Sequence, residues 1–459
     1  MKEKMSNIRV GSLFHGVCHG YTYDGLGILD TKEGLSFFVN GLIKGEEAEV
    51  EVTFVSMKAN YAKIRKITLL SQDRITPLCP VATACGGCSF QNLNYQKQLE
   101  FKKEKVINAF HNIARINFPV EDCVGMDEPY FYRNKTQMPL GLDRKGRLIS
   151  GFYRAKSHDI IAIDKCVIED KKASGILTTI KGLMTSMKIL PYNEDTREGI
   201  IRHILIRTSF HYPEVMVVII TNADSFPSRG NFVKALRKAH PEITTIVQNV
   251  NKRDTNVILG NQENVLFGPG FIKDDILGVR YRISAKSFYQ VNPLQTEKLY
   301  SIAIEKAQLT GEEVVLDAYC GIGTISLIAA KKAKEVIGVE IVKEAIIDAK
   351  NNARRNDINN ASFYVDDAGE FMLDFVKSGK KLDVLFMDPP RKGADEKFLS
   401  SVLAAKPNKI IYVSCDPATL ARDIATLIKS YKIESITPVD MFPQTFHVET
   451  VCALRLKEH

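Results

Sequence analysis

The chain has 459 residues, 45% of them hydrophobic and 25% charged, which is typical of globular proteins and too apolar for a disordered one. At ~150 residues per domain, such a chain has room for about three domains. No apolar run approaches the roughly 18 residues of a membrane span. Residues 1–11 are polar and lack the pattern of a secretory signal. We therefore expect a cytoplasmic protein with no membrane partner.

The net charge is +8, from 62 basic and 54 acidic side chains, and it is unevenly distributed. Residues 131–165 carry eight basic side chains against three acidic ones. Such a segment suits a surface that follows the phosphates of a nucleic acid. An ordinary solvated face explains the same excess about as well.

Residues 7–70 alternate short apolar runs with glycines. Stretches such as VEVTFV have the period of two that is typical of strands, and glycines separate these stretches. The pattern predicts a small antiparallel β-barrel at the N-terminus.

A cysteine cluster follows the predicted barrel. The chain has nine cysteines and no export signal, so a disulfide framework is not expected. Cys79, Cys85 and Cys88 lie within ten residues, in CPVATACGGCSF. Three thiols this close indicate a metal site that needs a fourth ligand. On spacing alone, a zinc site fits nearly as well as an iron–sulfur cluster.

The rest of the chain divides into a mixed part and a regular part. Residues 94–115 place apolar side chains at helical spacing and predict one long helix, whereas 130–270 contain β-rich runs such as IIRHILIRTSF. From about residue 280, strands and helices alternate, as in EVVLDAY followed by TISLIAAKKA. This alternation predicts a parallel, doubly wound α/β sheet with helices on both faces.

Ligands of such sheets bind at the carboxyl ends of the strands. Asp317 opens the glycine-rich run DAYCGIGT, and Glu340 lies 23 residues further on, where a carboxylate can bind ribose hydroxyls. A nicotinamide cofactor is one interpretation, but the third glycine of its fingerprint is missing. The fourth strand ends in Asp388-Pro-Pro, whose charge would repel a pyrophosphate but tolerates the sulfonium of S-adenosylmethionine. The set resembles the class I methyltransferase fold.

The fifth strand ends in Cys415, where a substrate would face the donated methyl group. Uracil C5 is too electron-poor to attack a sulfonium, but addition of a thiolate to C6 makes C5 nucleophilic. A base must then remove the C5 proton. Glu449 is our candidate for this base, because burial beside the substrate would raise its pKa, and His447 is the rival. Taken alone, Cys415 is more often a small buried residue, but the Asp-Pro-Pro and His-x-Glu context reverses that interpretation.

Five motifs, FYQVNP, DAYCGIGT, DPPRKG, SCDPATLARD and MFPQTFHVE, together resemble the RNA uracil-C5 methyltransferases, the enzymes that make 5-methyluridine. The resemblance runs in order across nearly the whole chain. It implies that Cys415 is the nucleophile and Glu449 the general base. It also implies six contacts to S-adenosylmethionine: Gln290, Tyr319, Thr324, Glu340, Asp367 and Asp388. Relatives can differ at Thr324 and Asp367.

The same resemblance implies an RNA-binding apparatus. The N-terminal barrel resembles the TRAM module, an OB-like RNA-binding fold. In YFYRNKTQMPLG, Arg133 and Lys135 are candidates for phosphate contacts. A [4Fe–4S] cluster is implied with the ligands Cys79, Cys85, Cys88 and Cys166. Each aromatic of the barrel, taken alone, is more often a core residue than a stacking platform. The candidate RNA-binding side chains of the barrel are Phe37, Phe38, Phe54, Tyr61, Lys58, Lys63 and Arg65.

We therefore predict three domains: a TRAM-like barrel at 1–70, a mixed α+β domain with the cysteine cluster at 71–275, and the methyltransferase domain at 276–459. The helix at 94–115 is expected to pack on the methyltransferase domain. Because the chain carries both TRAM and the cysteine cluster, it resembles the branch that acts on an unstacked uridine of 23S ribosomal RNA. The alternatives are the same chemistry on the T-loop uridine of tRNA, and a non-catalytic RNA-binding or chaperone protein. No obligate protein partner is expected.

Overall fold

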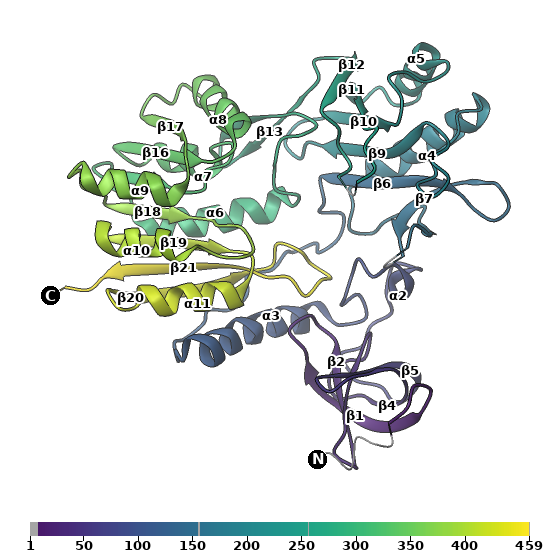
Figure 1. The fold of residues 1–459 in the computed structure, drawn as a ribbon, viewed down its shortest axis with the longest axis horizontal. Helices are drawn as coiled ribbons and strands as arrows, with labels where there is room; N and C mark the ends of the chain where they lie inside the picture. The colour runs from purple at the N-terminus through teal and green to yellow at the C-terminus, as the bar shows by residue number, and fades with distance from the viewer. Residues whose placement is uncertain (1–7, 155–156, 256, 459) are drawn as a thin grey trace. The chain divides into compact units, whose positions relative to one another are not determined.

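The computed structural model describes residues 8–154, 157–255 and 257–458 (Figure 1). Its contacts divide the chain into two compact units. The first comprises the described part of Met1–Lys105 together with Phe442–His447, and the second comprises Val106–Met441 together with the described part of Val448–His459. The division into three domains stays a prediction.

The first unit begins with a closed barrel of five strands in the order β1-β2-β3-β5-β4, which confirms the barrel predicted at the N-terminus. From Ala48 to Val52, every second side chain of β4 is buried, including Val50, and this burial removes apolar surface from water. The barrel is not wholly antiparallel, because β3 and β5 pair in parallel. The strands are β1 (Leu13–Tyr21), β2 (Gly27–Thr31), β3 (Ser36–Val39), β4 (Glu47–Val55) and β5 (Asn60–Leu69).

The predicted helix over 94–115 is present as two segments. The α-helix α3 (Tyr95–Ala109) continues into a π-helical turn, η1 (Phe110–Ala114), before Arg115 ends the helix with a φ of 59°. Gln98 of α3 donates to the side chain of Gln444 at 3.1 Å and accepts from its backbone N–H at 3.0 Å. These two bonds explain why Phe442–His447 belongs to the first unit.

The second unit contains a mixed seven-stranded sheet in the order β12-β11-β10-β9-β6-β7-β8. Only β10 and β11 pair in parallel. One face forms a core with two helices, in which Ile204 and Val217 pack with Ile176 and Ile180 of α4. The elements are β6 (Lys135–Leu142), β7 (Leu148–Tyr153), β8 (Ile160–Ala162), α4 (Lys171–Ser186), β9 (Ile201–Thr208), β10 (Val215–Thr221), α5 (Arg229–Ala239), β11 (Ile243–Val250) and β12 (Gln262–Phe267).

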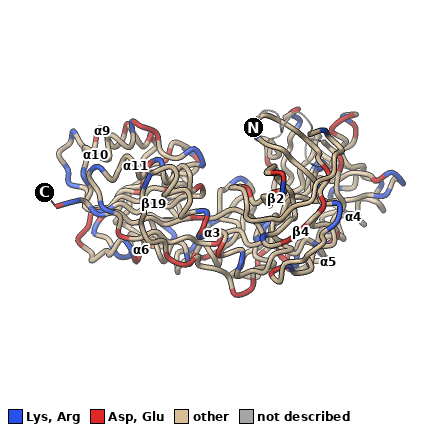
Figure 2. The backbone as a smooth tube through the Cα atoms, turned by 90° about the horizontal axis from the view of Figure 1, so that it is seen from below, with Lys and Arg blue, Asp and Glu red and all other residues tan. Residues whose placement is uncertain are grey.

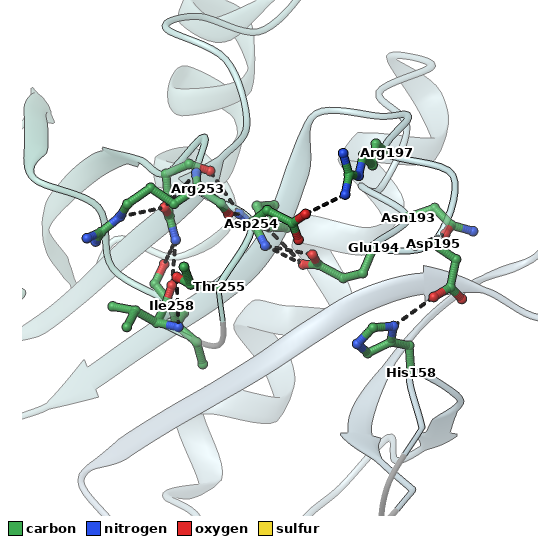
Figure 3. Close-up of polar contacts among 12 residues, drawn as sticks. His158, Asn193, Glu194, Asp195, Arg197, Arg253, Asp254, Thr255 and Ile258 are labelled. Carbon is green, nitrogen blue, oxygen red and sulfur yellow. Dashed lines mark hydrogen bonds and ion pairs between the residues drawn. The ribbon is translucent and has the colours of Figure 1, made fainter.

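A polar cluster joins the loops at the start of β9 (Figure 3). Arg202, which is 5% exposed, donates to both carboxylate oxygens of Glu194 and to the carbonyl of Arg253 at 2.8 Å. Arg197 forms an ion pair with Asp254. Since the buried guanidinium is matched by a carboxylate and by carbonyls, this cluster holds the loops together.

The second sheet of this unit has the order β17-β16-β15-β18-β19-β21-β20. The predicted parallel sheet is present from β17 to β19, and β21 runs antiparallel between β19 and β20. The strand order reverses at β15, which has β16 on one side and β18 on the other. In open α/β sheets a ligand binds at such a switch point, beyond the carboxyl ends of the strands. These strands are β15 (Val314–Asp317), β16 (Glu335–Glu340), β17 (Ala361–Val365), β18 (Val384–Met387), β19 (Lys409–Ser414), β20 (Tyr431–Val439) and β21 (Glu449–Leu456).

Six helices accompany this sheet, and a hairpin precedes it. The helix α11 packs against the π turn η1. No helix in the described part of the chain is both long and apolar enough to span a bilayer. The remaining elements are α2 (Ala82–Cys85), β13 (Ile272–Ile276), β14 (Val279–Ile283), α6 (Pro293–Ala307), α7 (Thr324–Ala330), α8 (Lys343–Arg355), α9 (Ala368–Lys377), α10 (Glu396–Ala405) and α11 (Pro417–Leu427).

Candidate active site

Cys415 and Glu449 lie at the ends of two neighbouring strands. β19 ends at Ser414, one residue before Cys415, and β21 begins at Glu449. The antiparallel register pairs Ser414 with Thr450, so Cys415 comes opposite Glu449. The strand ladder alone therefore brings a thiol and a carboxyl group together.

Burial and two neighbouring carboxyl groups keep Cys415 protonated. The thiol is half-buried, and burial raises its pKa to about 11, with Glu449 and Asp388 adding to the rise. Arg391 acts in the opposite direction and lowers this pKa. At neutral pH the resting side chain is therefore a thiol, and Arg391 is the cation that favours its thiolate.

Three carboxyl groups crowd the carboxyl edge of the sheet. Glu449 is 7% exposed, and burial and the charge of Asp388, opposed by Arg391, raise its pKa to about 8. Burial also raises the pKa of Asp388 to about 7 and that of Asp317 to about 6. Because like charges this close cannot all ionise freely, the edge favours a positively charged ligand.

The loop after β15 offers space and acceptors to a nucleoside cofactor. Gly321 and Gly323 have φ values of 54° and 82°, and a Cβ added at Gly321 would meet no atom within 4 Å. The carboxylate of Glu340 accepts N–H bonds from Gly321 at 3.3 Å and from Val342 at 3.0 Å. An open glycine turn, a fixed carboxylate and the acidic edge together fit S-adenosylmethionine.

The other predicted cofactor residues have varied surroundings. The ring of Tyr319 lies edge-on to Phe398 at 5.5 Å, and Thr324 is the first residue of α7. Asp367 is exposed and caps α9, accepting from the N–H groups of Gly369 and Glu370 at 2.9 and 3.2 Å. One oxygen of Asp367 is therefore already used to stabilise that helix.

Gln290 enters from the segment before α6. Its carbonyl accepts from the amide of Asn134 at 3.0 Å, and its side chain is hydrogen-bonded to Tyr300. Tyr300 is 4% exposed, and burial raises its pKa, with Asp388 and Glu449 contributing to the rise. The sequence carried no signal for Tyr300. Arg391 was visible in DPPRKG, where its charge could have suggested a partner for the thiol.

The cysteines of the predicted metal site lie in different units. Cys79, Cys85 and Cys88 belong to the first unit and Cys166 to the second. Cys85 ends the short helix α2, and Gly86 then turns the chain with a φ of 70°. Across the described residues, no group of three or more His, Cys, Asp or Glu side chains could hold a metal ion. The arrangement therefore does not support the predicted iron–sulfur cluster.

The rival base His447 belongs to the first unit. Its ring lies 4.2 Å from that of Phe446 and 6.0 Å from that of Phe442. Within that unit, the imidazole of His447 therefore lies against two phenylalanine rings.

The barrel separates the predicted RNA-binding side chains into two groups. Phe37 is fully buried and stacks on Phe14 at 4.9 Å, so its place in the predicted binding set was wrong. A barrel interior needs large apolar side chains, and alternation directs Phe37 inward. Phe54 is 56% exposed, and its ring lies 6.1 Å from that of Tyr61, whose ring also contacts Phe38. Lys58 is exposed, whereas Lys63 and Arg65 both form ion pairs with Glu51.

The second unit gathers cations beside the Gln290 segment. Lys135 lies opposite Arg207 in the β6–β9 ladder, and Arg207 donates to the carbonyl of Ser287 at 2.6 Å. Burial, together with the charges of Arg207 and Arg133, lowers the pKa of Lys135 to about 8. Figure 2 shows Lys and Arg interspersed with Asp and Glu along the chain. Against this mixed background, the group of Arg133, Lys135 and Arg207 is suited to an anionic ligand.

Comparisons with known proteins indicate the family to which the chain belongs. Residues 247–457 match the family described as tRNA (Uracil-5-)-methyltransferase. An uncharacterized RNA methyltransferase of Staphylococcus aureus strain MSSA476 is 42% identical over 456 residues, which cover 99% of this chain and 100% of that protein. A similar protein of Staphylococcus epidermidis strain ATCC 12228 is 42% identical over 457 residues, with the same coverage of both chains.

A solved structure extends the similarity to the fold. The crystal structure of Pyrococcus abyssi tRNA (uracil-54, C5)-methyltransferase in complex with S-adenosyl-L-homocysteine has a TM-score of 0.78 and 30% identity. The match covers 96% of this chain and 100% of that one. The second sheet and its helices thus have the class I methyltransferase fold. The chain belongs to the RNA uracil-5-methyltransferase family, and it is an RNA methyltransferase that uses S-adenosylmethionine.

We expect Glu449→Gln to stabilise the protein at alkaline pH. Since the pKa of Glu449 is raised to about 8 in the folded chain, folding favours its protonated form. This contribution is complete below the ordinary carboxyl pKa and is lost as the pH rises through about 8, by at most about 5 kcal/mol. Urea unfolding of both proteins between pH 5 and pH 9 measures the difference. A constant difference across this range would contradict the raised pKa.

Proposed function

We propose that this enzyme methylates C5 of a uridine in ribosomal RNA through a transient bond between Cys415 and C6 of the base. The supporting observation is the ladder register that sets Cys415 opposite Glu449. A nucleophile and a proton acceptor on one side of a ring are what this substitution requires.

The reaction proceeds in three steps. Sγ of Cys415 adds to C6 as the thiol proton passes to solvent, which leaves Glu449 ionised, and the electron pair of the C5–C6 double bond moves towards O4. S-adenosylmethionine, when bound, supplies an electrophilic methyl group to C5. Glu449 then takes the C5 proton, the double bond re-forms, and the thiolate leaves C6.

The electrostatics of the site match these demands. Because the resting thiol has its pKa raised to about 11, loss of its proton has to accompany attack on the ring. A carboxyl with its pKa raised to about 8 is a stronger base, once ionised, than an exposed glutamate. Arg391 lowers the pKa of both groups, so it favours the thiolate and the carboxylate together.

Phosphate contact is proposed for Arg133 and Lys135, and the buried Arg207 adds positive charge beside Lys135. Lys135 and Arg207 are neighbours in the ladder, and Arg207 and Asn134 hold the segment that carries Gln290 through the carbonyls of Ser287 and Gln290. Phosphates beside a uridine that has left its stack would meet this positive charge. The exposed rings of Phe54 and Tyr61 are proposed to stack on unpaired bases.

The substrate has two candidates. The proposed target is 23S ribosomal RNA, because the N-terminal barrel and the cysteine cluster in the sequence resemble that branch of the family. The second candidate is tRNA, since the solved structure with 30% identity is a tRNA (uracil-54, C5)-methyltransferase. Both candidates share the chemistry proposed for Cys415 and Glu449.

A covalent adduct tests the nucleophile. With S-adenosylmethionine and RNA carrying 5-fluorouridine, we expect a complex that survives denaturation, because fluorine cannot be removed as a proton. Gel electrophoresis with labelled RNA measures it. Cys415→Ala should form no adduct, whereas Cys452→Ala, a buried thiol of the same sheet, should retain it.

The base is tested on natural uridine. Glu449→Gln should methylate at least about 100-fold more slowly, the usual contribution of a general base, and should accumulate enzyme–RNA conjugate. Unchanged turnover would transfer the role to another group, with His447 the first to examine.

Mapping 5-methyluridine distinguishes the two substrates. In total RNA from cells that lack this protein, we expect the modification to disappear from 23S ribosomal RNA and to persist in the tRNA T-loop. Restoration by the wild-type chain but not by Cys415→Ala assigns the loss to this enzyme. The opposite pattern, with only tRNA affected, would make tRNA the substrate.

An iron–sulfur cluster on Cys79, Cys85, Cys88 and Cys166 is kept as a separate proposal, supported by the sequence resemblance alone. Protein purified without oxygen should contain iron and sulfide and absorb visible light. Cys88→Ala should lose the iron, whereas Cys18→Ala, a barrel-core thiol, should keep it. Stoichiometric zinc without iron, or no metal at all, would overturn the proposal.

A further inference from the structure

The SCDPATLARD motif contains two residues for which the chemistry above has no use, Arg422 and Asp423. Both lie in α11, the helix that begins at Pro417, two residues after Cys415. Asp423 is 1% exposed, although a carboxylate is costly to bury without partners. The hydrogen bonds of the Asp423 carboxylate show which parts of the chain it connects.

Asp423 is fully matched by donors from three parts of the chain. Its Oδ2 accepts from the N–H of Ala394 at 2.8 Å and from the hydroxyl of Tyr412 at 2.7 Å. Its Oδ1 accepts from Nε of Arg422 at 2.8 Å. The carboxylate thus joins α11, the strand β19 and the loop after Asp-Pro-Pro.

Arg422 holds the same loop from its other side. Its Nη2 donates to the carbonyl of Lys392 at 2.9 Å and to that of Ala394 at 3.3 Å. A Cβ added at Gly393 would lie 2.4 Å from Nη2 of Arg422 and 2.6 Å from Oδ2 of Asp423. Gly393 also has a φ of 78°, so the loop passes this pair only because the residue is glycine.

Arg391 is the residue immediately before the part of the loop that is held. Lys392, Gly393 and Ala394 are fixed to α11 by the contacts above. Since α11 begins just after Cys415, the same helix positions the thiol and the loop that carries Arg391. The guanidinium of Arg391 influences both Cys415 and Glu449 electrostatically.

We propose that Arg422 and Asp423 are positioning residues that, through their bonds to Lys392 and Ala394, fix the loop that carries Arg391. The inference rests on the proposed function, and it adds that two residues outside the reaction act on Cys415 and Glu449 through Arg391. The printed bonds of Arg422 and Asp423 go to the loop, to Tyr412 of β19 and to each other.

The charge on the thiol gives a readout that needs neither RNA nor cofactor. Only the thiolate reacts with iodoacetamide, so the rate of Cys415 alkylation at fixed pH reports its ionised fraction. The rate is measured between pH 7 and pH 9 by mass spectrometry of the peptide that contains Cys415. Thermal melting of each variant checks that it is folded.

Three variants and one control separate the outcomes. Arg422→Gln and Asp423→Asn should each slow the alkylation of Cys415 by about 3- to 10-fold, which corresponds to a rise of about half a unit to one unit in its pKa. Arg391→Gln should slow it by a similar factor. Arg455→Gln, which removes an ion pair with Glu434 in the same sheet, should leave the rate unchanged.

The double variant Arg391→Gln/Arg422→Gln decides the mechanism. If Arg422 acts through Arg391, the double variant alkylates at the rate of Arg391→Gln alone, because the charge to be positioned is already gone. An undiminished effect of Arg422→Gln in that background, or no effect in the wild-type background, would overturn the proposal. Half of the Arg422 side chain is exposed, so this variant folds even if Asp423→Asn does not.

Failure of this inference is distinguishable from failure of the proposed function. If Cys415 is not the nucleophile, wild-type enzyme forms no adduct with 5-fluorouridine RNA, whatever the alkylation rates. If Arg422 and Asp423 do not position Arg391, the adduct forms in the wild-type enzyme but the double variant shows independent effects.

Discussion

The antiparallel pairing of β21 with β19 is the constraint on which the site depends. Backbone hydrogen bonds fix the register, and the register places Glu449 opposite the residue that follows β19. A shift by one residue would turn Glu449 to the other face of the sheet and present a neighbouring side chain instead. The chemistry of the site thus depends on β21, which follows the parallel strands in the chain and is antiparallel to β19.

The ladder brings charges together at a cost in stability. Asp317, Asp388 and Glu449 lie at the ends of different strands, and burial raises the pKa of each carboxyl. A protein selected for stability alone would place apolar side chains there. Retaining three carboxyl groups at one edge makes sense where a cationic ligand and a proton acceptor are needed at the same place.

The loop that carries Arg391 has a fixed backbone conformation because Arg422 and Asp423 hydrogen-bond to it. The loop after Asp-Pro-Pro has little regular structure of its own, yet a buried carboxylate and a guanidinium hydrogen-bond to the backbone of Lys392 and Ala394, the residues on either side of Gly393. Fixed polar groups contribute more to electrostatic catalysis than mobile ones, because they need no reorganisation during the reaction. The same logic explains why a glycine is needed at Gly393, where the chain passes closest to the pair.

By itself, the amino-acid sequence determined the elements and the kind of chemistry. The period of two predicted the barrel, the alternation of strands and helices predicted the parallel sheet, and the motifs indicated RNA methylation, because these signals lie in short local stretches. The sequence could not assign Phe37 to the barrel interior, since both faces of a short strand can carry aromatic residues. It also did not assign a role to Arg391, Tyr300 or Asp423.

Those assignments came only from the tertiary structure. Cys415 and Glu449 meet through strand pairing, and Asp423 reaches Ala394 because a helix packs beside a loop that is distant in the chain. Burial decides the protonation of the carboxyl groups, and burial is a property of the packed molecule. Local patterns therefore determined which groups the chain carries, and packing decided which of them act on one another.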